Sequence, residues 1–265
     1  MNTIIISTDM EGLTGICRWS QVTPTSSEYE QGCAALRRDL RLVVDELTVS
    51  DHRLVVVDGH WTGTNLKPGD VGPAYLSSGT RMPWGMVEGV QDDDVVGVLL
   101  LGYHGCAGSQ GAMAHTWDTV FPEVRFNGTL CGEITLAAML ARQCGVPIIG
   151  VSGDDHACIE AKATCGAGTP TAEVKRSLSY ESVQFHPDAE TRLRAMARNA
   201  LLAVGNVTPD KEQHCIMAKF LDHEAVDRAG LVPGSVRLDS HALEFAGTAK
   251  ACFDALRVWA MLAEH

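Results

Sequence analysis

The sequence predicts an α/β protein: a mostly parallel, open sheet with helices on both faces, joined to a smaller C-terminal α+β lobe. The first observation is that short apolar runs alternate with segments of helical periodicity over the first 160 residues. The second is that these runs are apolar at nearly every position, as in strands buried on both faces of a sheet. We expect the larger α/β domain to span residues 1–163 and the smaller lobe residues 164–265.

Four strands and two helices are expected in the larger domain. The strands are residues 3–8, 54–57, 95–101 and 146–151. Ser26-Ser27-Glu28 can cap a helix that reaches Leu47, with apolar residues at helical spacing along it. A second helix opens at Gly132-Glu133 and ends near Cys144. Between them, Asn127-Gly128 is the usual pair for a tight hairpin turn.

The second half of the chain has a less regular pattern. It predicts a helix over residues 189–203, strands over 215–220 and 236–245, and a closing helix over 247–262. Such a mixture, without strict strand–helix alternation, indicates an α+β lobe.

Charge and composition exclude several classes of partner. The formal net charge of −12 would repel a phosphate backbone, so we expect no nucleic-acid partner. The chain has neither a basic amphipathic segment nor a long apolar run, so we expect no membrane association and no signal peptide. Nine cysteines without a CxxC pair favour free thiols in a reducing compartment. We therefore expect a cytoplasmic protein.

Metal-ligating side chains stand at the ends of three successive predicted strands. Asp9 and Glu11 follow the first strand, His60 the second and His104 the third. In open α/β sheets, ligands bind beyond the carboxyl ends of the strands. Carboxylate with imidazole is a ligand set for zinc or another first-row divalent ion rather than calcium. With one more carboxylate, these residues would suit a pair of ions.

Several further residues are open to more than one interpretation. His115 follows a glycine-rich loop and can act as a general base or hydrogen-bond an oxyanion, but it can equally be an ordinary loop histidine. Glu133 can be a metal ligand, or a carboxylate favoured by the dipole of the helix that it opens. Asp154-Asp155 can cap the next helix or support the site. Cys106 has no visible activating partner, so a cysteine mechanism is disfavoured.

The ordered motif set resembles the zinc-dependent D-aminopeptidases first associated with dipeptide-transport operons. That family opens with Ser-x-Asp-x-Glu-Gly, which stands here as Ser7-Thr8-Asp9-Met10-Glu11-Gly12. Its later landmarks follow in order over the region up to about residue 160: Asp58-Gly59-His60, Met86-Val87-Glu88-Gly89, Gly102-Tyr103-His104, Gly111-x-Met113-x-His115, Asn127, Gly132-Glu133 and Gly153-Asp154-Asp155.

The resemblance implies a division of labour among these residues. Asp9 would bridge two zinc ions per subunit, with Glu11 and His104 completing one site and His60 and Glu133 the other; another first-row divalent ion is the alternative. His115 matches the family's catalytic position. We expect a general base or transition-state hydrogen-bonder, because metal ions already make water a capable nucleophile near neutral pH. The resemblance also implies a homo-oligomer such as a decamer, and makes residues 1–163 the catalytic domain.

The leading functional hypothesis is hydrolysis of a peptide or amide bond, as by an aminopeptidase acting on short, D-configured peptides. The alternatives are a pathway-specific amidohydrolase that trims a peptide-like biosynthetic intermediate, a two-metal phosphoesterase, and a non-catalytic α/β binding module. Gly59, Gly105 and Thr116 replace the family's usual Ser, Ala and Ser beside site residues. Bulky aromatics at Trp61, Trp84 and Trp117 lie close to the same motifs, so both features bear on the substrate.

Overall fold

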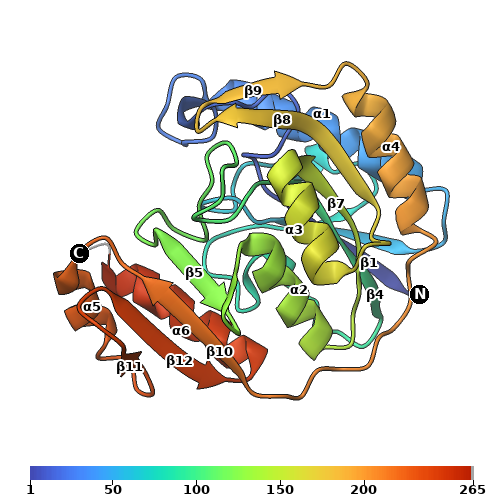
Figure 1. The fold of residues 1–265 in the computed structure, drawn as a ribbon. Helices are drawn as coiled ribbons and strands as arrows, with labels where there is room; N and C mark the ends of the chain where they lie inside the picture. Colours follow the sequence, from blue (N-terminus) through green and yellow to red (C-terminus); the bar gives the residue numbers. More distant parts are fainter. Residues whose placement is uncertain (264–265) are drawn as a thin grey trace.

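A seven-stranded sheet forms the centre of the larger part of the computed structural model, which describes residues 1–263 (Figure 1). In spatial order the strands are β3 (Tyr75–Ser77), β2 (Arg53–Asp58), β1 (Thr3–Thr8), β4 (Val95–Tyr103), β7 (Ile148–Asp154), β8 (Thr171–Ser179) and β9 (Ser182–Phe185). The strands from β3 to β8 run parallel, and β9 pairs antiparallel with β8. The predicted mostly parallel open sheet is confirmed.

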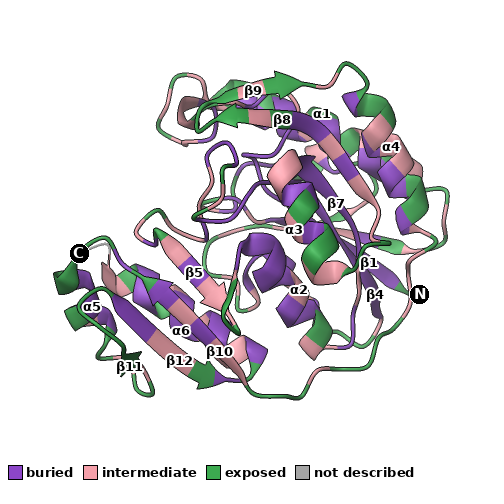
Figure 2. Ribbon diagram, viewed as in Figure 1, coloured by how far each residue is buried: buried purple, intermediate pink, exposed green. Residues whose placement is uncertain are grey.

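Helices cover both faces of this sheet. On one face lie α1 (Tyr29–Leu47) and α4 (Ala189–Ala200); on the other lie α2 (Glu133–Gln143) and α3 (Asp155–Cys165). Successive side chains of a strand point to opposite faces. Ile4 and Ile6 accordingly pack in the hydrophobic cluster of α1 and α4, and Ile5 packs in that of α2 and α3. Both β1 and β4 are buried along their whole lengths (Figure 2).

A second, antiparallel sheet forms the smaller part of the molecule (Figure 1). Its strands in spatial order are β11 (Val236–Arg237), β12 (Ala242–Gly247), β10 (His214–Lys219), β5 (Glu123–Phe126) and β6 (Thr129–Leu130). Two helices accompany it, α5 (His223–Ala229) and α6 (Ala249–Ala263). Because α6 packs on β10 and β12 and also contacts α2, it joins the two parts of the molecule.

The two sheets exchange elements along the chain. The strands β8 and β9 and the helix α4 come after residue 164 but belong to the first sheet and its covering layer. Conversely, β5 and β6 come before it and pair within the second sheet. The division into domains at 1–163 and 164–265 stays a prediction.

Most predicted elements are found within a few residues of their expected ends. The strand expected over 146–151 begins at Ile148 and extends to Asp154. The strand expected over 236–245 is instead two strands, β11 and β12, joined by a turn. Asn127 and Gly128, with φ of 50° and 81°, form the predicted hairpin turn between β5 and β6. Three short 3₁₀ helices complete the fold: Trp19–Gln21, Pro68–Asp70 and Gly85–Val87.

Two glycines allow the ends of β1 and β4 to approach closely. A Cβ on Gly12 would overlap the carbonyl oxygen of Tyr103. Gly102 has φ of +82°, and a Cβ there would overlap the carbonyl oxygen of Asp9. Only glycine fits both the space and, at Gly102, the left-handed backbone. The ends of the two strands, and the polar residues that follow them, therefore lie side by side.

Two further features concern the cysteines and the length of the helices. All nine cysteines are free. Among residues 1–263, the helices are too short or too polar for any of them to cross a lipid bilayer.

Candidate metal centre

The six residues predicted from the sequence lie together at the carboxyl edge of the first sheet. They come from five segments of the chain, yet all six contact one another or line one cavity: Asp9 and Glu11 after β1, His60 after β2, His104 after β4, His115 in the loop that follows, and Glu133 at the start of α2. The parallel arrangement of β2, β1 and β4 places these strand ends at the same edge.

Asp9 lies between two histidines. Its Oδ1 is 3.1 Å from Nδ1 of His60, and its Oδ2 is 3.4 Å from Nε2 of His104. On the His60 side, Oε2 of Glu11 is 3.2 Å from the same Nδ1. On the His104 side, Oε1 of Glu133 is 3.8 Å from Nε2. One carboxylate thus faces both halves of the cluster, which is the arrangement that a bridging ligand needs.

The three histidines are oriented by backbone carbonyls. Each donates one ring N–H: His60 Nε2 to Val22 at 2.8 Å, His104 Nδ1 to Gly105 at 2.9 Å and His115 Nδ1 to Met113 at 2.9 Å. A carbonyl can only accept, so these contacts fix which nitrogen carries the proton in the neutral ring. In each ring the other nitrogen, with its lone pair, faces the carboxylates, as in metal-ligating histidines.

Several buried atoms of the cluster have no hydrogen-bond partner. Among the described residues, these include Oδ2 of Asp9, Oε2 of Glu11 and Nε2 of His104. Burying such atoms without a partner is costly, and native proteins rarely do so without a reason. All three are lone-pair donors in one cluster, with Glu11 on the His60 side, His104 on the other and Asp9 between them, so bound cations can satisfy them. Carboxylate oxygens with imidazole nitrogens fit zinc or a similar divalent ion.

Burial and mutual charge shift the titration of these groups. Burial, reinforced by the negative charge of Glu11, raises the pKa of Asp9 to about 7. Burial alone would lower the pKa of His104, but the charges of Glu133 and Asp9 outweigh it and raise that pKa to about 9. The carboxylates likewise raise the pKa of His60, despite its burial. The cluster therefore favours bound positive charge, and without a metal ion it binds protons.

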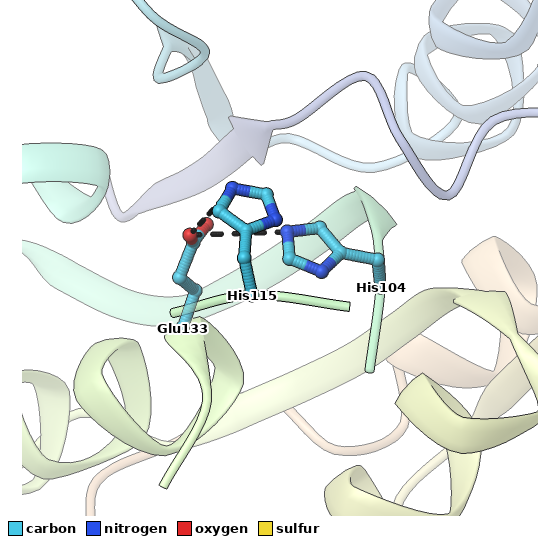
Figure 3. Close-up of side chains that lie close together, drawn as sticks. All are labelled: His104, His115 and Glu133. Atoms are coloured by element: carbon cyan, nitrogen blue, oxygen red, sulfur yellow. Dashed lines mark ion pairs between the residues drawn. The ribbon is translucent and has the colours of Figure 1, made fainter. Parts of the chain in front are cut away.

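His115 lies against His104 on the Glu133 side of the cluster. Its Nε2 is 3.7 Å from Oε1 of Glu133, whose carboxylate faces both rings in Figure 3. Burial lowers the pKa of His115, and the positive charge of His104 lowers it further. Its ring is therefore neutral near pH 7, with Nε2 free to accept a proton. The same geometry also lets His104, His115 and Glu133 form a three-residue metal group.

The side chains that lie closest together form two groups that differ from the two ligand sets implied by the family resemblance. The structure groups Asp9, Glu11 and His60 on one side and His104, His115 and Glu133 on the other. The resemblance instead joins Glu11 with His104 and His60 with Glu133. Which residues share an ion stays a prediction.

A carboxylate that the sequence did not reveal fixes the start of α2. Glu160, on α3, accepts the backbone N–H of Gly132 at 2.9 Å and that of Thr135 at 3.1 Å. It thus caps a helix other than its own. Glu133 is further held by the backbone N–H of Trp117, which donates to its Oε1 at 2.8 Å. No sequence signal pointed to Glu160, because its partners lie more than 20 residues away.

Two buried charged residues shape the loops that carry the ligands. Lys175, on β8, donates from Nζ to the carbonyl oxygens of Leu13 at 3.2 Å, Ile16 at 2.6 Å and also Glu11. Asp58 accepts the backbone N–H of Asn65 at 2.6 Å and thereby closes the loop that contains His60. Asp58 was part of a recognised motif, whereas Lys175 gave no signal because a lone strand lysine usually faces solvent.

The structure indicates the roles of several residues that the sequence left open. Burial raises the pKa of Cys106 to about 12, which favours the protonated thiol and disfavours a cysteine mechanism. Asp154 caps α3 by accepting the N–H of Ala157 at 2.7 Å. The buried hydroxyl of Thr116 donates to the carbonyl of Cys131 at 2.8 Å, and so anchors the loop beside His115.

A cavity of about 310 Å³ opens onto the cluster. Its walls include Trp19, Trp61 and Trp117, together with Asp118. Trp61 and Trp117 were expected near the site, but Trp19 was not. Trp84, also expected there, lies outside the cavity lining, with Nζ of Lys250 5.4 Å from the centre of its ring.

Comparison with known proteins agrees with the geometry. Residues 2–260 match the profile of a family described as D-aminopeptidase. A D-aminopeptidase of Bacillus subtilis (strain 168) is 30% identical over 240 residues, or 88% of this chain and 86% of that protein. A solved structure, described as the Zn-dependent D-aminopeptidase DppA from Bacillus subtilis, a self-compartmentalizing protease, aligns over 99% of this chain and 98% of that chain with a TM-score of 0.92 at 28% identity. Because the match extends over almost the whole sequence, the chain belongs to the D-aminopeptidase family.

Proposed function

We propose that this protein is a two-zinc aminopeptidase that releases the N-terminal residue of short peptides, with D-configured residues as its substrates. One observation carries the proposal: three buried lone-pair atoms without partners, on Asp9, Glu11 and His104, converge at the carboxyl edge of the sheet. Family membership supports peptide hydrolysis. The relative described as Zn-dependent supports zinc as the metal.

Five residues would hold the two ions, with Asp9 between them: Asp9, Glu11, His60, His104 and Glu133. The contacts of Asp9 with a histidine on either side support its bridging role. When bound, a pair of zinc ions polarises a substrate carbonyl and makes water nucleophilic near neutral pH. The backbone carbonyls behind His60 and His104 fix the tautomer of each neutral ring, so that the metal-facing nitrogen would carry the lone pair once a metal ion replaces its proton.

His115 would handle the proton of the reaction. Its Nδ1 proton is committed to the carbonyl of Met113, and its lowered pKa leaves Nε2 unprotonated near pH 7. Nε2 can therefore take a proton from the attacking water and pass it to the leaving amine. The protonated ring can also hydrogen-bond the oxyanion that develops on the carbonyl.

The charge of the cavity favours a peptide over a phosphate ester. Four carboxylates line it, those of Asp9, Glu11, Asp118 and Glu133. Among the described residues, the lining includes no lysine or arginine. Three of these residues would be taken up by the zinc ions, and Asp118 would remain to attract the free ammonium group of a peptide and to repel a phosphate dianion.

The remaining expectations fit the same proposal. The six site residues fall within 1–163, which would be the catalytic domain, with 164–265 as the smaller lobe. The relative's description as a self-compartmentalizing protease supports a homo-oligomer, for which the family resemblance implies a decamer. The nine free thiols support the reducing environment of the cytoplasm.

The test is metal quantification of the purified protein, paired with a screen of L- and D-configured dipeptides, aminoacyl amides and a chromogenic phosphate ester. We expect two zinc ions per chain and hydrolysis confined to substrates with a free amino terminus and a D-residue. Cleavage of the phosphate ester without cleavage of any peptide would contradict the proposal. So would a protein that binds no divalent metal.

A further inference from the structure

Three of the chain's five tryptophans line the cavity above the metal centre: Trp19, Trp61 and Trp117. The other two have evident structural roles. Trp259 is fully buried, and its indole N–H donates to Ser235 at 2.9 Å. Trp84 lies beneath the ammonium group of Lys250. Trp19 and Trp117 also pack against the hydrophobic cores, but unlike Trp259 and Trp84 they face the cavity as well, and Trp61 packs against neither core.

Trp61 and Trp117 both have a left-handed backbone, with φ of 53° and 67°. This conformation is strained for bulky side chains and persists where the surrounding structure or function demands it. At Trp117 the reason is visible, because the turned backbone directs its N–H to Oε1 of Glu133 at 2.8 Å. As a consequence, the residue whose backbone holds this carboxylate also contributes its indole to the cavity wall.

Two of the three indoles form firmly supported walls. Behind Trp117, the ring of Phe253 from α6 meets it edge-on at 5.1 Å, and the guanidinium of Arg257 lies 5.8 Å from its centre. Trp19 packs against His115 with ring centres 5.1 Å apart. Both tryptophans are only partly exposed. Rigid aromatic surfaces of this kind bind apolar groups at little cost in conformational entropy.

Trp61 differs because its side chain is mostly open to solvent. Its exposed fraction is 59%, and its nearest aromatic neighbour is the ring of His60, with centres 6.0 Å apart. A large, exposed indole next to a candidate metal ligand is available to a bound molecule. Its exposure places it at the rim of the cavity, whereas Trp19 and Trp117, which also line the cavity, are less exposed.

We propose that the cavity selects short peptides whose N-terminal residue has an aromatic or large apolar side chain. This inference rests on the proposed aminopeptidase function. Trp117 and Trp19 contact the N-terminal side chain, and Trp61 contacts the residue that follows it. An aminopeptidase admits the free amino terminus to the closed end of its site, so the rest of the peptide passes the rim.

Size and surface chemistry support this assignment. A volume of about 310 Å³ is at the small end of ligand pockets, enough for a bulky residue but not a folded chain. An alanine side chain would leave the indoles of Trp19 and Trp117 in contact with water. An aromatic side chain would cover them and gain the additional stabilisation of ring–ring contacts.

The test compares kcat/KM for dipeptides that begin with D-Phe, D-Leu or D-Ala and share one second residue, and then varies the second residue. For the zinc-loaded wild type, we expect D-Phe to be preferred over D-Ala by about tenfold or more. Trp117→Ala should lower that preference by about tenfold, and Trp117→Phe should retain most of it. Trp61→Ala should alter the preference for the second residue instead. Trp84→Ala is the matched control and should leave both preferences unchanged.

Zinc content is measured for every variant, so that a changed preference is compared only among metal-loaded proteins. Equal kcat/KM for D-Phe and D-Ala in the wild type would overturn the inference while leaving the aminopeptidase function intact. So would an unchanged preference in both Trp117→Ala and Trp61→Ala. A zinc-loaded wild type that hydrolyses no peptide at all would instead overturn the proposed function itself.

Discussion

The imidazole of His115 lies parallel to that of His104, with ring centres 4.2 Å apart and 6° between their planes. The two rings differ in their surroundings. His104 is fully buried and its Nε2 has no hydrogen-bond partner, whereas His115 also lines the cavity. Stacking keeps His115 beside the metal centre without requiring it to complete the ligand set. This position agrees with the proton-transfer role that we propose for His115.

Replacing His115 should therefore separate metal binding from turnover. We expect His115→Ala to retain both zinc ions and to lose about 10²- to 10⁴-fold in kcat, the usual contribution of a general acid or base. Zinc content and steady-state kinetics check this. His52→Ala is the control, because that histidine lies just before β2, away from the carboxyl edge. Loss of one zinc ion from His115→Ala would show that His115 is a ligand.

Replacing a proposed ligand should remove metal and activity together. In His60→Ala, Asp9 and Glu11 lose the imidazole that lies within 3.2 Å of both. In Glu133→Ala, the carboxylate that faces His104 and His115 is gone. We expect both variants to bind less zinc and to fall to background activity in the peptide assay, with the fold preserved by circular dichroism. An active His60→Ala variant with normal zinc content would contradict the proposed site.

The sequence predicted the parts of the site that depend on strand ends. Asp9, His60 and His104 follow apolar runs, and parallel strands bring their carboxyl ends to one edge. Residues that act through distant contacts gave no such signal. Lys175 meets Glu11 across 164 residues of sequence, and Glu160 caps a helix whose start lies 28 residues before it. Such partners depend on how helices and strands pack, which local periodicity does not encode.

The second sheet also depends on contacts between distant parts of the chain, which the sequence did not predict. Asn127-Gly128 predicted a hairpin from local turn chemistry, and β5 and β6 form it. The partner of β5 is β10, about 90 residues later. The sequence predicted the turn after β5 and the strand over 215–220, but not β5 itself or its pairing with β10. Neither strand carries a pattern that specifies the other.

Zinc should stabilise the protein more as the pH rises. Without a metal ion, the pKa of Asp9 in the folded protein is about 7, against 3.8 for a free aspartate side chain. The pKa of His104 is about 9, against 6.5 for a free histidine side chain. Both folded values are raised, so the folded state holds extra protons. Protonation of His104 contributes fully to the free energy of unfolding below pH 6.5, and this contribution is lost as the pH rises to about 9. The contribution from protonation of Asp9 is lost over a lower range, between pH 3.8 and about 7.

Thermal unfolding measures this effect directly. We expect the Tm of chelator-treated protein to fall between pH 6 and pH 9 by several degrees more than that of zinc-loaded protein. Zinc takes over the role of the lost protons, so the difference in Tm between the two forms widens with pH. A difference that stays constant or narrows over this range would contradict the assignment of Asp9 and His104 to the metal centre.

Lys175 should be necessary for the metal centre although it contacts no proposed metal-binding atom. Its buried ammonium group donates to three carbonyl oxygens in the segment that carries Glu11. In Lys175→Met, these carbonyls lose their donor, and we expect the free energy of unfolding to fall by about 3 kcal/mol. Because the segment loses its anchor, zinc affinity should also fall, even at temperatures where the variant is fully folded.

Arg176→Met provides the matched control for that variant. Arg176 is the next residue of β8, with the same change of a basic side chain to methionine, but it is exposed. We expect its stability and zinc affinity to be close to those of the wild type, since isolated surface charges contribute little. The comparison of zinc dissociation constants decides the role of Lys175. If Lys175→Met is destabilised but binds zinc as tightly as Arg176→Met, the lysine supports the fold alone and does not position Glu11.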